Sequence, residues 1–245
     1  MASIDDMDLP TFDTLFLDAG GVLVNPNWQR VAEVLTRHGA YVTAAALQEA
    51  EPRAKREMDS VEYVAASGDA ARARRYFDLV FDLAGVAAGG ARQTGLAEVK
   101  EYHARENLWE DVPADAHSSL ARLQAAGLPI VVVSNSNGTL RELLGRRGLL
   151  GYFSLIVDSF EEGVEKPDPR LFEIALGRSG ASSGTTLHVG DFYEIDVVGA
   201  RAAGLHAALL DVAGLYPHHD CPRFESLTAL ADALCRDPRR SGLTA

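Results

Sequence analysis

Short apolar runs alternate with longer amphipathic segments along most of this chain. Near-continuous runs rich in Val, Ile and Leu cover residues 12–18, 129–134, 153–158, 186–191 and 206–211. Such runs are typical of strands buried on both faces of a parallel sheet. The helical periodicity between the later runs covers residues 114–126, 139–147, 169–179 and 196–203. Because strands that alternate with helices predict βαβ units, we expect an α/β fold with a doubly wound, Rossmann-like parallel sheet.

The segment directly after the first apolar run has a different pattern. Its helical periodicity covers residues 28–37, 43–58, 61–84 and 91–106, with almost no strand signal. A helical domain is therefore predicted as an insertion into the α/β core. The expected organisation is a core of residues 10–25 and 108–236, a helical domain of residues 26–107 and a polar tail of residues 237–245.

Composition narrows the class of protein. The chain has 245 residues, 47% of them hydrophobic and 24% charged, which is ordinary for a globular protein in water. Its net charge of −12 argues against nucleic-acid or anionic-membrane partners, since phosphate backbones attract basic surfaces. No apolar stretch reaches the roughly 18–20 residues of a membrane span, and residues 1–10 lack a signal-peptide pattern. Cys221 and Cys235 form no CxxC pair and suggest no disulfide framework, so we expect a reduced, cytoplasmic protein. We further expect a monomer or a homodimer.

Four short motifs put candidate chemical groups at strand ends and helix starts. They are Asp18 before Ala19-Gly20-Gly21, Ser134-Asn135 after an apolar run, Lys166 in Lys166-Pro167-Asp168-Pro169, and Asp191 after Val189-Gly190 with Asp196 further on. In doubly wound sheets, ligands bind beyond the carboxyl ends of the strands. The motifs therefore predict one shared site at that edge, with Asp168 interpreted as the start of the following helix.

Taken together and in this order, the four motifs resemble those of the haloacid dehalogenase-like (HAD) hydrolase superfamily. The helical insertion lies where the helical-cap (C1) subtype of that superfamily carries its cap domain. The resemblance implies a Mg²⁺-dependent hydrolase that forms an aspartyl-phosphate at Asp18 and acts on a small phosphorylated metabolite.

The resemblance also assigns roles to the motif residues. Asp18 is the expected nucleophile, and Lys166 would neutralise both its charge and that of the phosphoryl group. The expected Mg²⁺ ligands are Asp18, Asp191 and the carbonyl of Gly20, with Asp196 either behind them or as an additional ligand. The expected phosphate donors are the Ser134 hydroxyl, Lys166 and the N–H groups of Asn135, Ala19 and Gly20.

Position 20 departs from the pattern of the superfamily's phosphatases, which usually have a second aspartate there. That residue protonates the leaving oxygen and activates the water, and Gly20 can do neither. General acid–base catalysis is typically worth about 10²–10⁴-fold, so its loss is expected to matter. Three explanations stay open: a leaving group that needs no proton, an acid from the helical domain (His38, His103 or Glu106), or binding without turnover.

Two alternative functions follow from this departure. One is a catalytically silent protein of this fold that binds or regulates a partner. The other is atypical hydrolysis of a C–P or C–halogen bond. The pair Asp191 and Asp196 argues against the metal-independent dehalogenase branch, whereas Lys55 in the helical domain keeps a Schiff-base mechanism for C–P cleavage open.

Overall fold

The computed structural model describes residues 11–60, 64 and 69–236. By its internal contacts the chain divides into two compact units, Met1–Leu23 with Val112–Ala245, and Val24–Asp111. The expected tail of residues 237–245 and part of the expected helix over 61–84 lie outside the described residues. We call the first unit the core and the second the helical unit.

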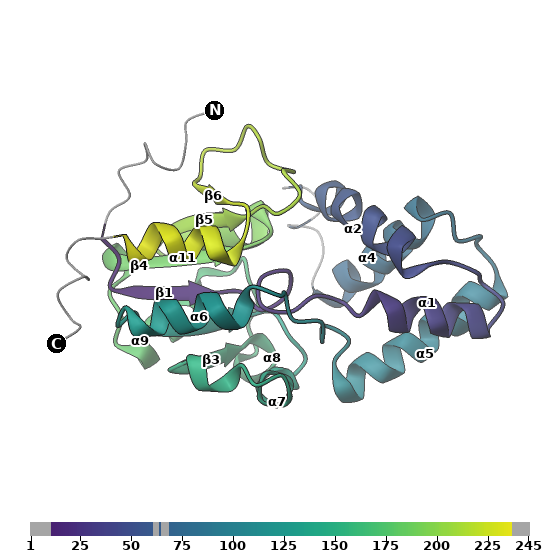
Figure 1. Cartoon of the computed structure of the whole chain (residues 1–245), viewed down its shortest axis with the longest axis horizontal. Coiled ribbons are helices and arrows are strands. Elements are labelled where there is room, and N and C mark those ends of the chain that lie inside the picture. The colour runs from purple at the N-terminus through teal and green to yellow at the C-terminus, as the bar shows by residue number, and fades with distance from the viewer. Residues whose placement is uncertain (1–10, 61–63, 65–68, 237–245) are drawn as a thin grey trace. The chain divides into compact units, whose positions relative to one another are not determined.

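A parallel sheet of six strands, in the order β3-β2-β1-β4-β5-β6, forms the centre of the core (Figure 1). The strands are β1 Thr14–Leu17, β2 Ile130–Ser134, β3 Leu155–Asp158, β4 Thr186–Gly190, β5 His206–Leu210 and β6 Arg223–Phe224. The first five lie within the apolar runs that predict strands. The α/β fold expected from the sequence is therefore confirmed.

The order of the strands reverses at β1. Leu17 lies opposite Val132 of β2 on one side and Val189 of β4 on the other, so the chain extends the sheet first in one direction and then in the other. At such a switch point, the connections leaving adjacent strands diverge and open a crevice at the carboxyl edge. Asp18 and Asp191 each directly follow one of these two central strands.

Helices cover both faces of the sheet. They are α6 Ala116–Ala125, α7 Leu140–Arg146, α8 Ser159–Glu162, α9 Pro169–Ser179, α10 Val198–Ala202 and α11 Leu227–Cys235, with short 3₁₀ turns at Leu150–Tyr152 and Ser183–Thr185. Figure 1 shows α6 and α11 side by side in front of the sheet. On the opposite face, Phe16 and Val131 pack in one buried cluster with Phe172 of α9 and Ala200 of α10.

Three features of the core differ from the sequence-based prediction. The strand β6 and the helix α11 are not among the predicted elements. In the case of β6, two residues are too few to show a hydrophobic pattern. The expected helix over 196–203 begins earlier, as a π-helical turn at Tyr193–Val197 that continues into α10. Single π turns are frequent at functional sites, and this one carries Asp196.

The helical unit contains four described helices: α1 Trp28–Arg37, α2 Ala44–Met58, α4 Asp69–Leu83 and α5 Gly90–Glu106. Trp28 is 1% exposed and donates its indole N–H to Glu51 of α2 at 2.9 Å. The guanidinium of Arg92 in α5 is buried and pairs with Asp78 and Asp82 of α4. Buried aromatic and ionic contacts thus join the helices of this unit to one another.

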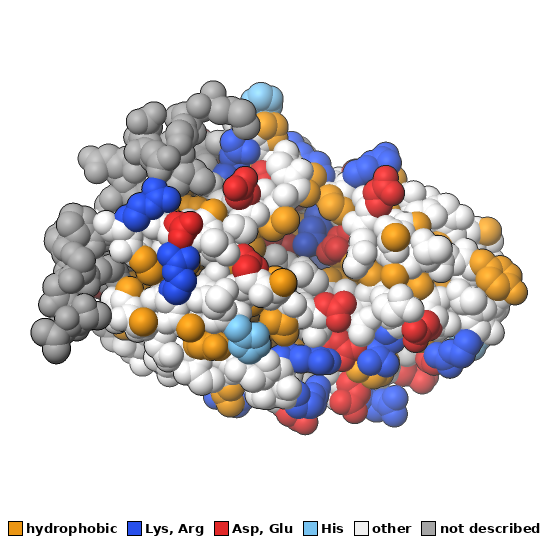
Figure 2. All heavy atoms as spheres, in the orientation of Figure 1, with side chains coloured by type: hydrophobic (Ala, Val, Ile, Leu, Met, Phe, Trp, Pro, Cys, Tyr) orange, Lys and Arg blue, Asp and Glu red, His pale blue; other side chains and the backbone are white. Residues whose placement is uncertain are grey.

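Charged side chains of both signs are interspersed over the described surface visible in Figure 2. Among the described residues, no helix is both long enough and apolar enough to cross a membrane.

Candidate active site

Three carboxylates meet at the carboxyl edge of the sheet. Asp18, Asp191 and Asp196 are all buried, and each offers an oxygen that lies within 4.8 Å of those of the other two. They come from two motifs that are far apart in the sequence but follow adjacent strands of the sheet. The structure therefore brings together the acidic residues that the sequence singled out.

The local fold explains how Asp18 reaches this edge. The preceding residues Leu15 to Leu17 are fully buried in β1, and the Asp18 N–H donates to the carbonyl of Val189 at 2.9 Å. The chain then turns at Gly21, whose φ of 73° is a conformation that favours glycine. The backbone hydrogen bond fixes Asp18 at the end of the strand. Its side chain remains 12% exposed and is therefore accessible to a ligand.

Lys166 is 1% exposed, and its ammonium lies between two carboxylates. Its Nζ is 2.7 Å from Asp196 Oδ1, to which it donates a hydrogen bond, and 2.8 Å from Asp18 Oδ1. The contact with Asp18 is an ion pair, and the nearby carboxylate favours the charged form of the lysine. The Lys166 ammonium thus forms ion pairs with two carboxylates.

Asn135 fixes the backbone of Lys166. Its side-chain amide donates to the Lys166 carbonyl at 3.0 Å and accepts the Lys166 N–H at 2.7 Å. The sequence assigned only the backbone N–H of Asn135 to the site, so this reciprocal pair is a role that pattern reasoning missed. Ser134, the last residue of β2, is 3% exposed and ends at the same edge of the sheet.

Asp196 accepts three hydrogen bonds. Besides Lys166, its Oδ1 lies 3.0 Å from Nε2 of His188, and its Oδ2 accepts the Phe192 N–H at 3.1 Å. His188 has no exposed surface and was not singled out by the sequence, where it stands within the apolar run of β4. A polar residue at the centre of such a run was the available signal.

Burial and ion pairing shift the pKa of each of these groups in opposite directions. Burial raises the pKa of Asp18 above its ordinary value, because the neighbouring Lys166 offsets only part of the desolvation. Burial opposes the ionised form of Asp196 too, but the Lys166 ammonium and the His188 hydrogen bond hold its pKa well below the usual range. Burial would lower the pKa of Lys166, but the two carboxylates raise it above the ordinary lysine value.

Gly190 leaves the space that Asp196 occupies. A Cβ atom at position 190 would overlap the carboxyl group of Asp196. Similarly, a Cβ at Gly199 would lie 2.9 Å from the backbone Cα of Pro167, so α10 packs directly against the loop of Lys166. Both glycines permit close approaches that position the lysine and its partner carboxylate.

Replacing Gly190 by Ala is expected to destabilise the protein by about 1–3 kcal/mol, because an overpacked site must shift Asp196 away from Lys166. Urea unfolding measures this change in free energy. Gly177→Ala is the matched control, because a Cβ there meets nothing within 4 Å and the residue lies in α9. That variant should match or exceed the wild-type stability, since Ala favours helix over Gly by about 1 kcal/mol. Equal stability of both variants and the wild type would contradict this reading of Gly190.

The acidic set fits a hard divalent cation such as Mg²⁺. Carboxylate and carbonyl oxygens are the ligands that this ion prefers, and it keeps several waters besides. The two oxygens of Asp196 already accept three hydrogen bonds, whereas Asp18 lies against the Lys166 ammonium alone in the described ion pairs. Among the three carboxylates, Asp18 is therefore more available for a cation than Asp196.

The candidate groups of the helical unit have partners within that unit. His38 lies 2.7 Å from Glu98, and Nδ1 of His103 accepts the Leu108 N–H at 3.0 Å. Lys55 pairs with Glu51 of the same helix at 3.3 Å. His38, His103 and Lys55 are therefore each engaged by a partner of the same unit.

Asp168 caps the helix that follows it, as the sequence predicted. Its side chain accepts the Arg170 N–H at 3.0 Å, and Pro169 occupies the first turn of α9. This cap begins the helix directly after the Lys166 loop. The role of Asp168 is therefore local and structural.

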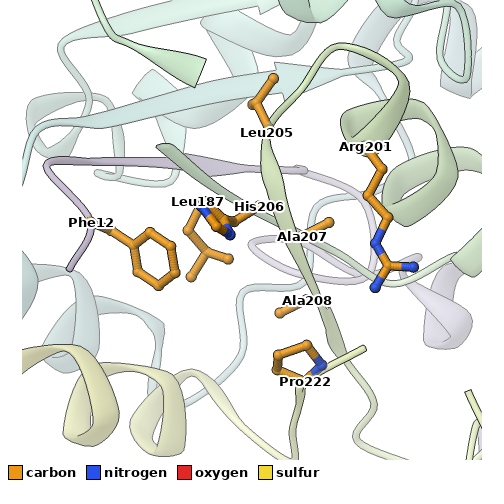
Figure 3. Close-up of a pocket in the computed structure, with 8 residues that line it drawn as sticks. All are labelled: Phe12, Leu187, Arg201, Leu205, His206, Ala207, Ala208 and Pro222. Atoms are coloured by element: carbon orange, nitrogen blue, oxygen red, sulfur yellow. The ribbon is translucent and has the colours of Figure 1, made fainter. Parts of the chain in front are cut away.

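A cavity of about 180 Å³ lies elsewhere in the core (Figure 3). Its lining residues are Phe12, Leu187, Arg201, Leu205, His206, Ala207, Ala208 and Pro222. Residues that precede β1 or lie early in β4 and β5 contribute to it, whereas Asp18 and Asp191 follow the carboxyl ends of their strands. This cavity includes no residue of the acidic cluster, so it is not the candidate active site.

Comparison with known proteins identifies the family. The family model of the haloacid dehalogenase-like hydrolase matches residues 12–204. Haloacid dehalogenase-like hydrolase domain-containing protein 3 of Danio rerio is 39% identical over 129 residues, 52% of this chain and 53% of the relative. Phosphoserine phosphatase of Thermus thermophilus is 38% identical over 149 residues, 60% of this chain and 59% of the relative. The chain thus spans little more than half the length of these curated relatives.

The crystal structure of HAD phosphatase from Thermococcus onnurineus has the same fold, with a TM-score of 0.55 and 20% identity over 91% of this chain and 97% of that one. A doubly wound α/β core with a carboxylate–lysine site at its switch point is the class that the structure defines. Because the family model covers most of the chain, the protein belongs to the haloacid dehalogenase-like hydrolase family.

Proposed function

We propose that this chain is a Mg²⁺-dependent phosphohydrolase that acts on a small phosphorylated metabolite through Asp18. The observation that carries the proposal is the Lys166 ammonium, 2.8 Å from Asp18 and 2.7 Å from Asp196 in a buried acidic cluster. The phosphatase named among its relatives supports the same reaction class. We further propose that the unit Val24–Asp111 serves as the family's helical cap.

Charge is the main obstacle to this reaction. A phosphate monoester is an anion, and its oxygens repel an anionic nucleophile, so the site must supply positive charge before the two can meet. The Lys166 ammonium is buried, stays protonated and lies against Asp18 Oδ1. It would neutralise the nucleophile and the incoming phosphoryl group together.

The proposed reaction has two chemical steps. An oxygen of Asp18 attacks phosphorus, the bond from phosphorus to the leaving oxygen breaks, and that oxygen departs with the electron pair. Water then attacks phosphorus of the aspartyl-phosphate, which releases inorganic phosphate and returns Asp18 as a carboxylate. The Lys166 ammonium, 2.8 Å from Asp18 Oδ1, favours the ionised carboxylate that this attack needs.

Asp18, Asp191 and the carbonyl of Gly20 would hold the Mg²⁺ ion, which when bound supplies positive charge to the phosphoryl oxygens. In this proposal Asp196 holds Lys166 instead of serving as a ligand, because its oxygens already accept three hydrogen bonds. The Ser134 hydroxyl and the backbone N–H groups of Ala19, Gly20 and Asn135 would donate to the remaining phosphate oxygens.

Gly20 restricts the leaving group in this proposal. It carries no side chain that could protonate a departing oxygen, so esters of acidic alcohols and acyl phosphates should react much faster than alkyl esters. The test measures phosphate release from acetyl phosphate, an aryl phosphate and glycerol phosphate, with Mg²⁺ and after its removal with a chelator. Mg²⁺-dependent release in that order of rates is expected. Absence of release from all three, or equal rates with and without Mg²⁺, would contradict the proposal.

Replacing Gly20 by Asp should raise kcat on glycerol phosphate by about 10²-fold, because an acid at this position can protonate the leaving oxygen. The rate on acetyl phosphate should change less than about threefold, since an acyl phosphate releases a stable anion. Gly20 does not have the positive φ of Gly21, so an aspartate at this position meets no left-handed backbone strain. The ratio of the two rates is the measurement, and an unchanged ratio would contradict the role assigned to position 20.

A further inference from the structure

His188 is a buried polar residue that the proposed reaction does not use. It lies in β4 opposite Phe16 of β1, and none of its surface is exposed. Its ring packs edge-on against Phe172 of α9, with centroids 4.9 Å apart and an interplanar angle of 76°. Its Nε2 lies 3.0 Å from Asp196 Oδ1, whereas its Nδ1 is buried with no hydrogen-bond partner among the described residues.

These contacts define the tautomer of His188. An ionised carboxylate only accepts hydrogen bonds, so Nε2 must carry the proton that it shares with Asp196. A second proton on the buried Nδ1 would have no acceptor among the described residues, so the contacts favour the neutral Nε2–H form. His188 thus donates a single hydrogen bond, from Nε2–H to Asp196 Oδ1.

Stability alone does not favour histidine at this position. An apolar side chain of similar size would pack against Phe172 and would leave no polar atom unpaired in the core. The benefit of the ring must therefore lie in its one hydrogen bond. That bond reaches the same oxygen, Asp196 Oδ1, that accepts from the Lys166 ammonium.

We propose that His188 is a positioning residue that fixes Lys166 through Asp196. Three donors, from His188, Lys166 and the Phe192 backbone, set the plane of the Asp196 carboxylate. That plane sets where the ammonium lies, 2.8 Å from the nucleophile Asp18. The order of contacts is His188, Asp196, Lys166 and Asp18, so the effect of His188 on the reaction passes through the lysine. This inference rests on the proposed function.

The first test uses kinetics with an aryl phosphate and three variants. His188→Leu removes the donor but keeps an apolar side chain, and kcat should fall by about 10- to 100-fold, as is typical for partners that orient a catalytic group. KM should stay within about threefold. His188→Gln can place an amide N–H near the Nε2 position and should recover most of kcat. Phe172→Leu perturbs the packing under the ring but keeps the donor. It should lower the melting temperature and leave kcat near the wild-type value.

The second test does not depend on turnover. The ¹⁵N shifts of the wild-type ring should report the Nε2–H tautomer, and the buried Lys166 ammonium should give an NMR signal that shifts or broadens in His188→Leu but not in Phe172→Leu. If the wild type hydrolyses no phosphate, the proposed function fails and these signals alone decide the positioning role. An Nδ1–H tautomer, an unchanged ammonium signal in His188→Leu, or wild-type kcat in that variant would each overturn the inference.

Discussion

Asp18→Asn will lower Mg²⁺-dependent phosphate release by at least about a thousandfold, because the amide cannot attack phosphorus and removing a nucleophile eliminates the covalent route. The side chain keeps its size, and only the charge next to Lys166 is lost. The measurement is kcat on acetyl phosphate under single-turnover and steady-state conditions. Formation of an acid-stable phosphoprotein by the wild type, but not by the variant, checks the same step directly.

The stability of Asp18→Asn provides the control for folding. A carboxyl group whose pKa is raised on folding stabilises the native state below its unfolded pKa, and this contribution is lost as the pH rises through the folded value. Above the folded pKa the ionised Asp18 therefore costs stability, and the neutral amide should remove that cost. The melting temperature of the variant minus that of the wild type should be more positive at pH 7 than at pH 4. Residual turnover close to that of the wild type would refute the nucleophile assignment.

Lys166→Met is expected to destabilise the protein by about 3–5 kcal/mol, because it leaves two buried carboxylates without their shared cation. Activity should be lost as well, since no other cation pairs with Asp18 among the described residues. Urea unfolding gives the free energy. Lys100→Met, at an exposed site in α5, is the matched control and should change stability by less than about 0.5 kcal/mol.

The double variant Lys166→Met with Asp18→Asn separates charge from packing. Removing one of the stranded carboxylates should recover part of the stability, because the uncompensated buried charge is halved. If the double variant is no more stable than Lys166→Met alone, the loss arises from packing of the long side chain and the electrostatic account is wrong.

The same pairs predict how wild-type stability depends on pH. Asp196 has a pKa lowered on folding, so its contribution is present above its unfolded pKa and is lost as the pH falls through the depressed folded value. Lys166 has a pKa raised above 10.5, so its contribution is present below that value and is lost as the pH rises through the folded value. The loss of unfolding free energy in Lys166→Met, relative to wild type, should therefore be largest between the unfolded pKa of Asp196 and the ordinary pKa of lysine.

The positions of Asp18, Ser134 and Asp191 could be predicted from sequence because each follows an apolar run. A buried parallel strand needs such a run on both faces, and parallel strands end at a common edge, so residues after them converge. The lysine was predictable for another reason: Lys166 stands in a proline-bounded motif directly before a helix. These signals are local, and they needed no knowledge of side-chain contacts.

The partners of those residues were not predictable in the same way. The amide of Asn135 pairs with the backbone of Lys166 across 31 positions of the sequence, and His188 shares Asp196 Oδ1 with that lysine. Such contacts depend on how a loop, a strand and a π turn pack together. The short strand β6 was missed for a related reason, since pairing with β5 defines it more than its own two residues do.

By itself, the sequence determined the strands, the helical insertion and the set of acids and the lysine, because hydrophobic periodicity and strand-end motifs act over a few residues. Only the tertiary structure decided what each acid does. Asp18 and Asp196 have the same side chain, but Asp18 pairs with one ammonium, whereas Asp196 accepts hydrogen bonds from three donors. The charge and availability of a carboxylate depend on burial and on neighbours brought together by folding, and those are properties of packing in three dimensions.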